Sequence, residues 1–163
     1  MVPHSAFTSE CSRLADRLFS KVILINGATR GDFDALWDTG ANTSCISHDV
    51  VQALGLVATG RVPIHTPSGT RVSRTYLVDI QLPNNVIVHG VQVCDSEIGG
   101  QGIGVLIGMN IINQGDFAVS NFQGKTVFTF RCPSVAKADY VKELNRQKVI
   151  GTHGPGKRKK KHK

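Results

Sequence analysis

The sequence predicts an all-β protein: a small closed or partly closed β-barrel with one or two short helices, then a C-terminal helix and a disordered basic tail. Short apolar runs rich in β-branched residues recur at close spacing along the chain. Glycine is frequent, with 17 in 163 residues, which favours many turns. Helical periodicity is confined to brief segments, so strands must supply most of the core.

Composition limits the class of protein. Apolar residues form 40% of the chain and charged residues 19%, which excludes a mainly disordered protein. No apolar run reaches the roughly 18 residues of a membrane span, and the N-terminus lacks a secretory signal pattern. We therefore expect a cytoplasmic protein with no membrane span. The 4 cysteines have no zinc-ligand spacing, so we expect free thiols and no metal or cofactor.

The net charge of +7 comes mostly from the C-terminal end. The basic residues there are Lys157, Arg158, Lys159, Lys160, Lys161 and Lys163. Such a tail fits two roles: a solubilising segment, or non-specific contact with nucleic acid or another polyanion. The rest of the chain is nearly neutral, so the hypothesis of polyanion binding depends on this tail alone.

The first half of the chain predicts strands, one short helix and a long hairpin. Strands are expected at 21–26 and 32–37, the second with apolar residues on alternate positions. Ser47 is the expected N-cap of a helix at about 48–54. Two period-2 strands within 62–82 predict a hairpin. Its turn would comprise Thr66, Pro67, Ser68, Gly69 and Thr70.

The second half predicts further short strands and a final helix. A run at 86–93 precedes a glycine-rich loop, expected to be mobile, and then a buried strand at 105–107. One helical turn at 109–113 and strands at 117–120 and 126–130 follow. Pro133 and Ser134 then open a helix at roughly 136–148.

These elements divide the chain into four parts. Residues 1–19 form an N-terminal extension or arm, 20–133 the barrel domain, 134–149 the C-terminal helix and 150–163 the disordered tail. Within the first part, Leu14 and Leu18 have a helical spacing, but an extended arm fits equally well.

The strongest chemical signal is Asp38-Thr39-Gly40-Ala41, directly after an apolar strand. This pattern suits an aspartic protease, because the glycine allows a tight turn and the loop can then hold a carboxylate in one orientation. A second element, Leu106-Ile107-Gly108, follows the hairpin. An apolar pair before a glycine is what a pepsin-type half-fold places behind its catalytic loop.

Together, residues 22–130 resemble the retropepsin family of single-domain, retroviral-type aspartic proteases, and look most like its cellular and bacterial members. The matching pieces, in the family's order, are KVILIN, LWDTGANTSCIS, HDVVQALGL, IHTPSGTRVSRTYLVDI and VLIGMNIINQGDFAVSN. The resemblance implies a retropepsin-like barrel at 20–133 that acts as an aspartic endopeptidase on a peptide or protein substrate.

The resemblance also implies roles for the motif residues. Asp38 would be catalytic, Thr39 would bond across a twofold axis, Gly40 would give the close turn and Ala41 would pack beneath it. The hairpin turn at 66–70 would form a flap over an extended peptide, and the 106–108 strand would support the loop. The chain departs from the family at Met109, where retroviral members carry Arg, and at Asn110, where close cellular relatives often have Asp.

One count determines the expected assembly. The chain contains a single Asp-Thr/Ser-Gly motif. The chemistry needs two carboxylates, one ionised to take a proton from water and one protonated to donate toward the scissile carbonyl. We therefore expect a homodimer in which Asp38 of each subunit faces the twofold axis.

Other hypotheses stay open beside this one. Asp38 could be a turn residue only, since Asp-Thr-Gly is good turn chemistry. The chain could then be a catalytically silent dimeric module that binds peptide and uses its tail on a polyanion, or a protein whose main role is nucleic-acid binding through that tail. Cys45 with His48 as its base is a weaker candidate, because no orienting group can be named.

Overall fold

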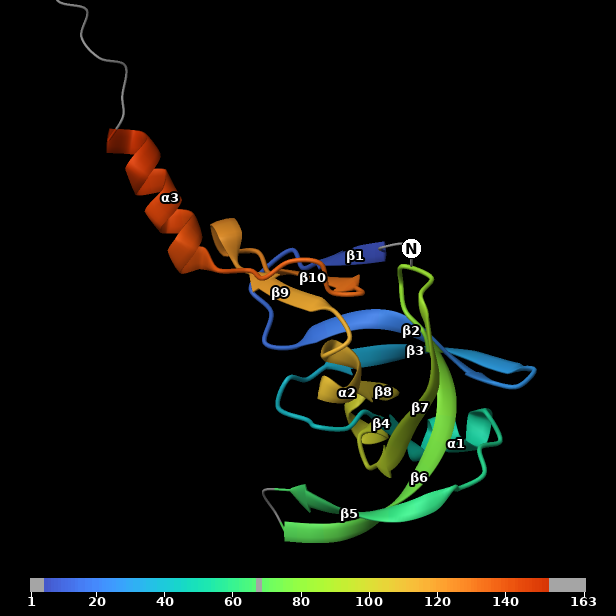
Figure 1. The fold of residues 1–163 in the computed structure, drawn as a ribbon. Coiled ribbons are helices and arrows are strands. Elements are labelled where there is room, and N and C mark those ends of the chain that lie inside the picture. Colours follow the sequence, from blue (N-terminus) through green and yellow to red (C-terminus); the bar gives the residue numbers. More distant parts are fainter. Residues whose placement is uncertain (1–4, 67–68, 153–163) are drawn as a thin grey trace, which may run out of the picture.

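A computed structural model of the chain describes residues 5–66 and 69–152, apart from the side chains of 65, 66 and 147–152. Within this part, seven strands form one sheet in the order β2-β3-β8-β4-β7-β6-β5. β2 also pairs with β6, with Leu24 opposite Ile80. Six of these strands thus close into a barrel, and the predicted all-β barrel is confirmed (Figure 1).

The elements follow the predicted order with small shifts in their ends. The strands are β1 (Ser5–Glu10), β2 (Leu18–Asn26), β3 (Thr29–Trp37), β4 (Cys45–Ser47), β5 (Gly60–Thr66), β6 (Gly69–Gln81), β7 (Ile87–Ser96), β8 (Val105–Ile107), β9 (Asp116–Ser120) and β10 (Val127–Cys132). The helices are α1 (His48–Ala53), α2 (Met109–Ile112) and α3 (Tyr140–Thr152), with the single 3₁₀ turns η1 (Gly99–Gln101) and η2 (Phe122–Gly124).

Helix α1 begins where the sequence predicts. Ser47 is its N-cap, with a side-chain oxygen that accepts a hydrogen bond from the backbone nitrogen of Val50 at 3.3 Å. Val50 and Leu54 are buried against the barrel. The cap and these apolar contacts explain why so short a helix forms.

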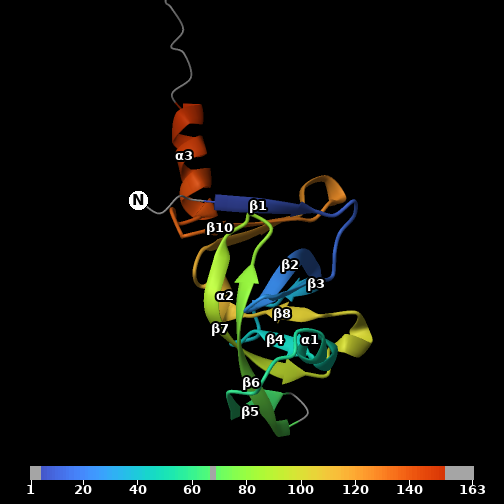
Figure 2. The ribbon, with the colours of Figure 1, turned by 90° about the vertical axis from the view of Figure 1, so that its right-hand side faces the viewer.

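The N-terminal arm is a strand rather than a helix. β1 pairs with β10, which pairs with β9, and the three form a second sheet beside the barrel (Figures 1 and 2). Phe7 of β1 reaches the ring of Trp37 with centroids 5.6 Å apart, and Phe117 of β9 stacks on the same ring at 5.6 Å. Aromatic packing on Trp37 therefore joins the second sheet to the barrel.

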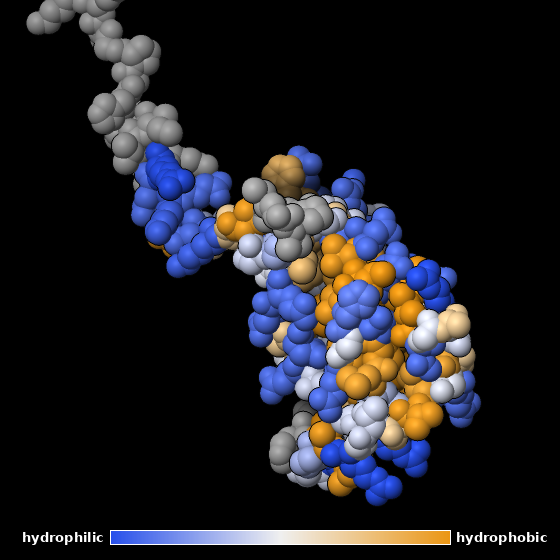
Figure 3. Space-filling model, turned by 45° about the vertical axis from the view of Figure 1, so that its right-hand side comes forward, coloured by the Kyte–Doolittle hydropathy of each residue, from blue (hydrophilic) through white to orange (hydrophobic). Residues whose placement is uncertain are grey.

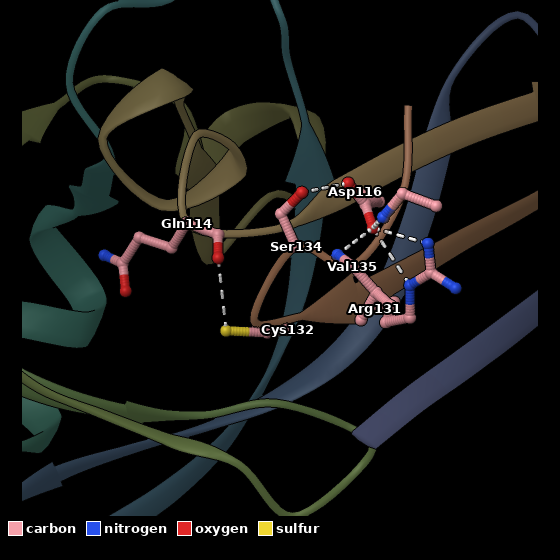
Figure 4. A network of polar contacts seen from close by, with 7 residues as sticks. Gln114, Asp116, Arg131, Cys132, Ser134 and Val135 are labelled. Atoms are coloured by element: carbon pink, nitrogen blue, oxygen red, sulfur yellow. Dashed lines mark hydrogen bonds and ion pairs between the residues drawn. The ribbon is translucent and has the colours of Figure 1, made fainter. Parts of the chain in front are cut away.

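The segment after β10 is held by one carboxylate. Asp116 accepts hydrogen bonds from the Ser134 hydroxyl, from the backbone nitrogen of Val135 at 2.8 Å, and from Arg131 at 2.6 Å (Figure 4). These donors, the Ser134 hydroxyl first, hold the pKa of the Asp116 carboxyl well below its usual range. The first residues after β10 are thereby tied to β9.

The C-terminal helix begins later than the sequence predicts. The expected start near 136 is wrong, because the backbone nitrogens of Val135 and Ala136 donate to Asp116 and residues 134–139 form no helix. Asp139 is the effective cap, with its side chain accepting from the backbone nitrogen of Lys142 at 3.1 Å. From Tyr140 the helix projects away from the barrel, and in Figure 3 its surface is largely hydrophilic while apolar surface gathers on the barrel.

Candidate active site

The Asp-Thr-Gly motif forms the loop between β3 and β4. The backbone nitrogen of Asp38 donates to the carbonyl of Ile107 at 2.9 Å, which fixes the start of the loop on β8. The carboxylate oxygen Oδ1 of Asp38 accepts from the backbone nitrogen of Gly40 at 2.8 Å. Asp38 is half-buried, while Thr39 and Gly40 are exposed. The loop thus orients the carboxylate and presents the motif at the surface of the subunit.

The predicted supporting strand lies directly behind this loop. β8 runs parallel to β3, with Leu106 opposite Leu36 and Ile107 opposite Trp37. Ile107 is fully buried, and Leu106 is half-buried. Two strands of the barrel therefore end side by side under the loop, which gives its first residue a rigid base.

Gly108 permits the close contact between this strand and the loop. A Cβ atom at this position would lie 2.8 Å from the carbonyl oxygen of Ala41 and 2.9 Å from that of Thr43. Met109 then donates its backbone nitrogen to the Ala41 carbonyl at 2.8 Å. The backbone φ of Gly108 is negative, so its conformation alone does not require glycine. Glycine is required here because the loop leaves no room for a Cβ atom.

Two polar residues that the sequence did not single out for this role complete the support. Ser44 is fully buried, and its hydroxyl and backbone nitrogen both donate to Oδ1 of Asn110, at 2.7 and 2.9 Å. The same hydroxyl accepts from the backbone nitrogen of Gly108 at 3.0 Å. This network connects the end of the Asp38 loop to helix α2, so buried polar groups help to fix the loop.

A pocket of about 500 Å³ opens beside the loop. Its lining residues are Gly40, Ala41, Asn42, Thr43, Cys45, Val62, Pro63, Ile64, Arg71, Thr75, Gln92, Cys94 and Ser96. The pocket therefore lies between the motif loop, the β5–β6 hairpin and β7. Figure 1 shows the hairpin extending to the same side of the barrel as the loop between β3 and β4.

The predicted flap belongs to this hairpin. Thr66 pairs with Gly69, and His65 with Thr70, at the end of β5 and β6. Gly69 has a φ of +127°, a backbone conformation that favours glycine. Pro67 and Ser68 lie outside the described residues, as do Lys157–Lys163 of the basic tail. The hairpin is confirmed as an element, while its role as a flap stays a prediction.

The pairing of Cys45 with a histidine base finds no support. The Cys45 thiol lies 3.0 Å from the thiol of Cys94, and this contact raises the Cys45 pKa. His48 Nε2 instead lies 3.6 Å from Oδ2 of Asp95. A thiol that is harder to ionise, and whose expected base contacts another residue instead, is a poor nucleophile.

A closed six-stranded barrel that carries one Asp-Thr-Gly loop on a supporting strand defines a single-lobe aspartic protease. Residues 23–114 match the model of a family described as "gag-polyprotein putative aspartyl protease". The match covers more than half of the chain, and the chain belongs to this family. Its class as a retropepsin-like aspartic endopeptidase, predicted from the motifs, is thereby confirmed.

Three solved structures that resemble the chain are described as proteases. A retropepsin-like aspartic protease from Rickettsia conorii is 14% identical, with 81% of this chain and 98% of that chain covered and a TM-score of 0.49. EIAV protease in complex with the inhibitor HBY-793 is 17% identical, covering 61% and 88%, with a TM-score of 0.47. Simian foamy virus (mac) protease is 15% identical, covering 59% and 92%, at 0.42. No curated protein sequence matched the chain.

No helix in the described part of the chain is long and apolar enough to span a membrane. The expected cytoplasmic location stays a prediction. The individual roles assigned to Asp38, Thr39, Gly40 and Ala41 also stay predictions. The structure holds Asp38 against β8, and it places Gly40 and Ala41, but not Asp38 or Thr39, in the lining of the pocket.

Proposed function

We propose that two copies of the chain form a twofold homodimer that hydrolyses peptide bonds, with the Asp38 carboxylate of each subunit acting on one water molecule. The observation that carries this proposal is the single Asp-Thr-Gly motif of the chain. A chain with one motif can supply the two required carboxylates only by pairing with a second copy.

The exposure of the motif loop supports the same assembly. Thr39 and Gly40 are exposed and Asp38 is only half-buried, although the backbone behind them is held by buried groups. In the dimer, the second subunit would cover this surface. The covered site would exclude bulk water, so the two carboxylates would interact strongly with each other and with the substrate.

The two Asp38 side chains take different roles in the reaction. Carboxylates held about 3 Å apart cannot both ionise, so they share one proton as a pair. The ionised member removes a proton from the attacking water, and the protonated member donates its proton toward the carbonyl oxygen of the scissile bond. Water is the nucleophile, and no covalent intermediate with the protein forms.

The substrate is a peptide in extended conformation. The pocket beside Gly40 and Ala41 is walled by Val62 and Ile64 of the hairpin and by polar groups such as Gln92. An extended strand between loop and hairpin would gain backbone hydrogen bonds, while alternate side chains would point into such pockets. The mixed lining of this pocket predicts a side chain of moderate size rather than a long charged one at that subsite.

A diverse peptide mixture analysed by mass spectrometry tests the activity. Wild type should cleave it between about pH 4 and 7, and Asp38→Asn should lower the rate by at least about 10³-fold while the protein stays folded. Asp32→Asn is the matched control, because Asp32 is exposed on β3 outside the loop. Cleavage by Asp38→Asn at the wild-type rate would refute the mechanism.

Mixed dimers test the assembly separately. Wild type is incubated with a growing excess of folded Asp38→Asn protein, under conditions in which subunits exchange. If the site needs Asp38 from both chains, activity should fall in proportion to the fraction of wild-type pairs. Activity that is unchanged by the excess would exclude a shared site. A folded dimer of wild type without any cleavage would instead support the catalytically silent peptide-binding module.

A further inference from the structure

Two of the four cysteines lie in direct contact in the wall of the pocket. Cys45 and Cys94 are far apart in the chain, but their sulfur atoms lie 3.0 Å apart. They are Cα partners on the adjacent parallel strands β4 and β7. Neighbouring strands are about 4.8 Å apart, and a disulfide needs Cα atoms about 4.4–6.8 Å apart. The backbone therefore already has a spacing that a disulfide can bridge.

The chemistry of the pair favours oxidation. The hydrogen bond between the thiols raises the pKa of Cys45 and lowers the pKa of Cys94. The Cys94 sulfur is therefore stabilised as a thiolate beside the Cys45 thiol. A thiolate is the form that reacts with oxidants. Cys94 is buried, whereas Cys45 is partly accessible, and both line the pocket of about 500 Å³. A small oxidant can approach the pair through this opening.

The environment does not favour a metal site at the same place. Zinc in structural sites takes four ligands. Among the side chains that the structure describes, no third His, Cys, Asp or Glu joins these two thiols. The other two cysteines, in contrast, are distant from each other. Cys132 pairs with Ser5 at one end of the β1–β10 pairing, whereas Cys11 follows Glu10 at the other end. They therefore provide an internal comparison.

We propose that Cys45 and Cys94 form a reversible disulfide when the protein meets a peroxide, so that the pair is a redox-modified site in the wall of the pocket. The thiolate attacks one oxygen of hydrogen peroxide and breaks the O–O bond, which gives a sulfenic acid and a hydroxide ion. The hydroxide takes up the proton that the thiol had released and becomes water. The second thiol then attacks the sulfenic sulfur, forms the S–S bond and releases a second water. In sum, two thiols and one peroxide give one disulfide and two waters. A small dithiol reverses the bond by exchange.

The experiment uses the full chain with Cys11→Ser and Cys132→Ser, which leaves only the proposed pair. The folded protein is treated with hydrogen peroxide, the excess is removed, and free thiols are alkylated before digestion without reductant. We expect the Cys45 and Cys94 peptides of the oxidised protein to be joined by a disulfide, and to separate on treatment with dithiothreitol. In a control that is unfolded and alkylated without peroxide, the two peptides should be separate from the start. Because the bond joins residues that are 49 positions apart in the chain, oxidation should raise Tm by roughly 10 °C.

The matched control is the converse variant, Cys45→Ser with Cys94→Ser, which keeps Cys11 and Cys132. It should form no joined peptide within one chain and show no rise in Tm. Peroxide that leaves both thiols of the first variant open to alkylation, or that converts them to sulfinic acids without a link, would overturn the proposal. Because the readouts are a covalent link and Tm, the result does not depend on peptidase activity.

Discussion

The side-chain carbonyl of Asn110 lies 2.7 Å from the hydroxyl of Ser44 and 2.9 Å from the backbone nitrogen of the same residue. One acceptor on α2 thus satisfies both donors of a buried serine at the end of the Asp38 loop. The position of the loop therefore depends on a residue far from it in sequence.

Replacement of Asn110 by alanine should destabilise the protein and misplace the loop. Two buried donors of Ser44 would lose their acceptor, at a cost of about 1–3 kcal/mol in the free energy of unfolding. Urea denaturation measures this change, and Asn113→Ala at an exposed position next to α2 is the control. Asn110→Asp keeps an acceptor for Ser44 and should recover part of the stability. An alanine variant as stable as the control would contradict the role of this network.

Gly108→Ala should be costly for a steric reason. The new Cβ would meet backbone atoms of Ala41 and Thr43 at 2.8–2.9 Å, and backbone atoms cannot swing aside as a side chain can. We expect a loss of about 1–3 kcal/mol, measured by thermal unfolding. Gly100→Ala is the matched control, because a Cβ there meets nothing within 4 Å. Equal effects of the two substitutions would show that the close contact at Gly108 is unimportant.

Phe7→Ala should loosen the second sheet from the barrel. Phe7 packs against Trp37 and also meets Phe128 edge-on at 5.8 Å. Its truncation should lower the free energy of unfolding by about 2–3 kcal/mol, less than for a fully buried ring. The chain has 1 Trp, so the fluorescence of Trp37 reports the change directly. Thr8→Ala, on the exposed face of the same strand, should have little effect.

Asp116 should make stability depend on pH in the acid range. The pKa of Asp116 is lowered in the folded protein, so the ionised carboxylate stabilises the fold. This stabilisation is complete above the ordinary carboxyl pKa of about 3.9, and it is lost as the pH falls from there toward the pKa of the folded state. Wild type should therefore have a higher Tm than Asp116→Asn at pH 7, and the difference should shrink below about pH 4. Asp32→Asn serves as the control. A difference in Tm that is constant from pH 7 to 2 would contradict this assignment.

Local patterns predicted most of the barrel. The β-branched run before Gly27, the cap at Ser47 and the alternation within the hairpin each depend on neighbouring residues, and each gave the correct element. The motif loop and its strand could also be located, because Asp-Thr-Gly and Leu-Ile-Gly are short and contiguous in sequence. These features are encoded within a few residues, so their structures can be read without knowing the fold.

Features that depend on distant partners could not be predicted in the same way. The extended form of β1 depends on β10, and the start of α3 depends on Asp116, which binds the segment before the helix. The contact of Cys45 with Cys94 appears only when β4 and β7 are placed side by side. Asp139 could have been recognised as the helix cap from sequence, but Ser134 is an equally good cap by residue type. The hydroxyl of Ser134 binds Asp116 instead, and this tertiary contact cannot be seen in the sequence.

The pairing of β1 with β10 joins the first and last strands of the described chain, with Ser5 opposite Cys132. Contacts between such distant residues carry a large loop-closure entropy and slow the search for the native topology. The hairpins β2–β3, β5–β6 and β6–β7 are local and can form early. We therefore expect the barrel strands to associate first and β1 to dock last, so a nascent chain would complete its second sheet only after β10 has been synthesised.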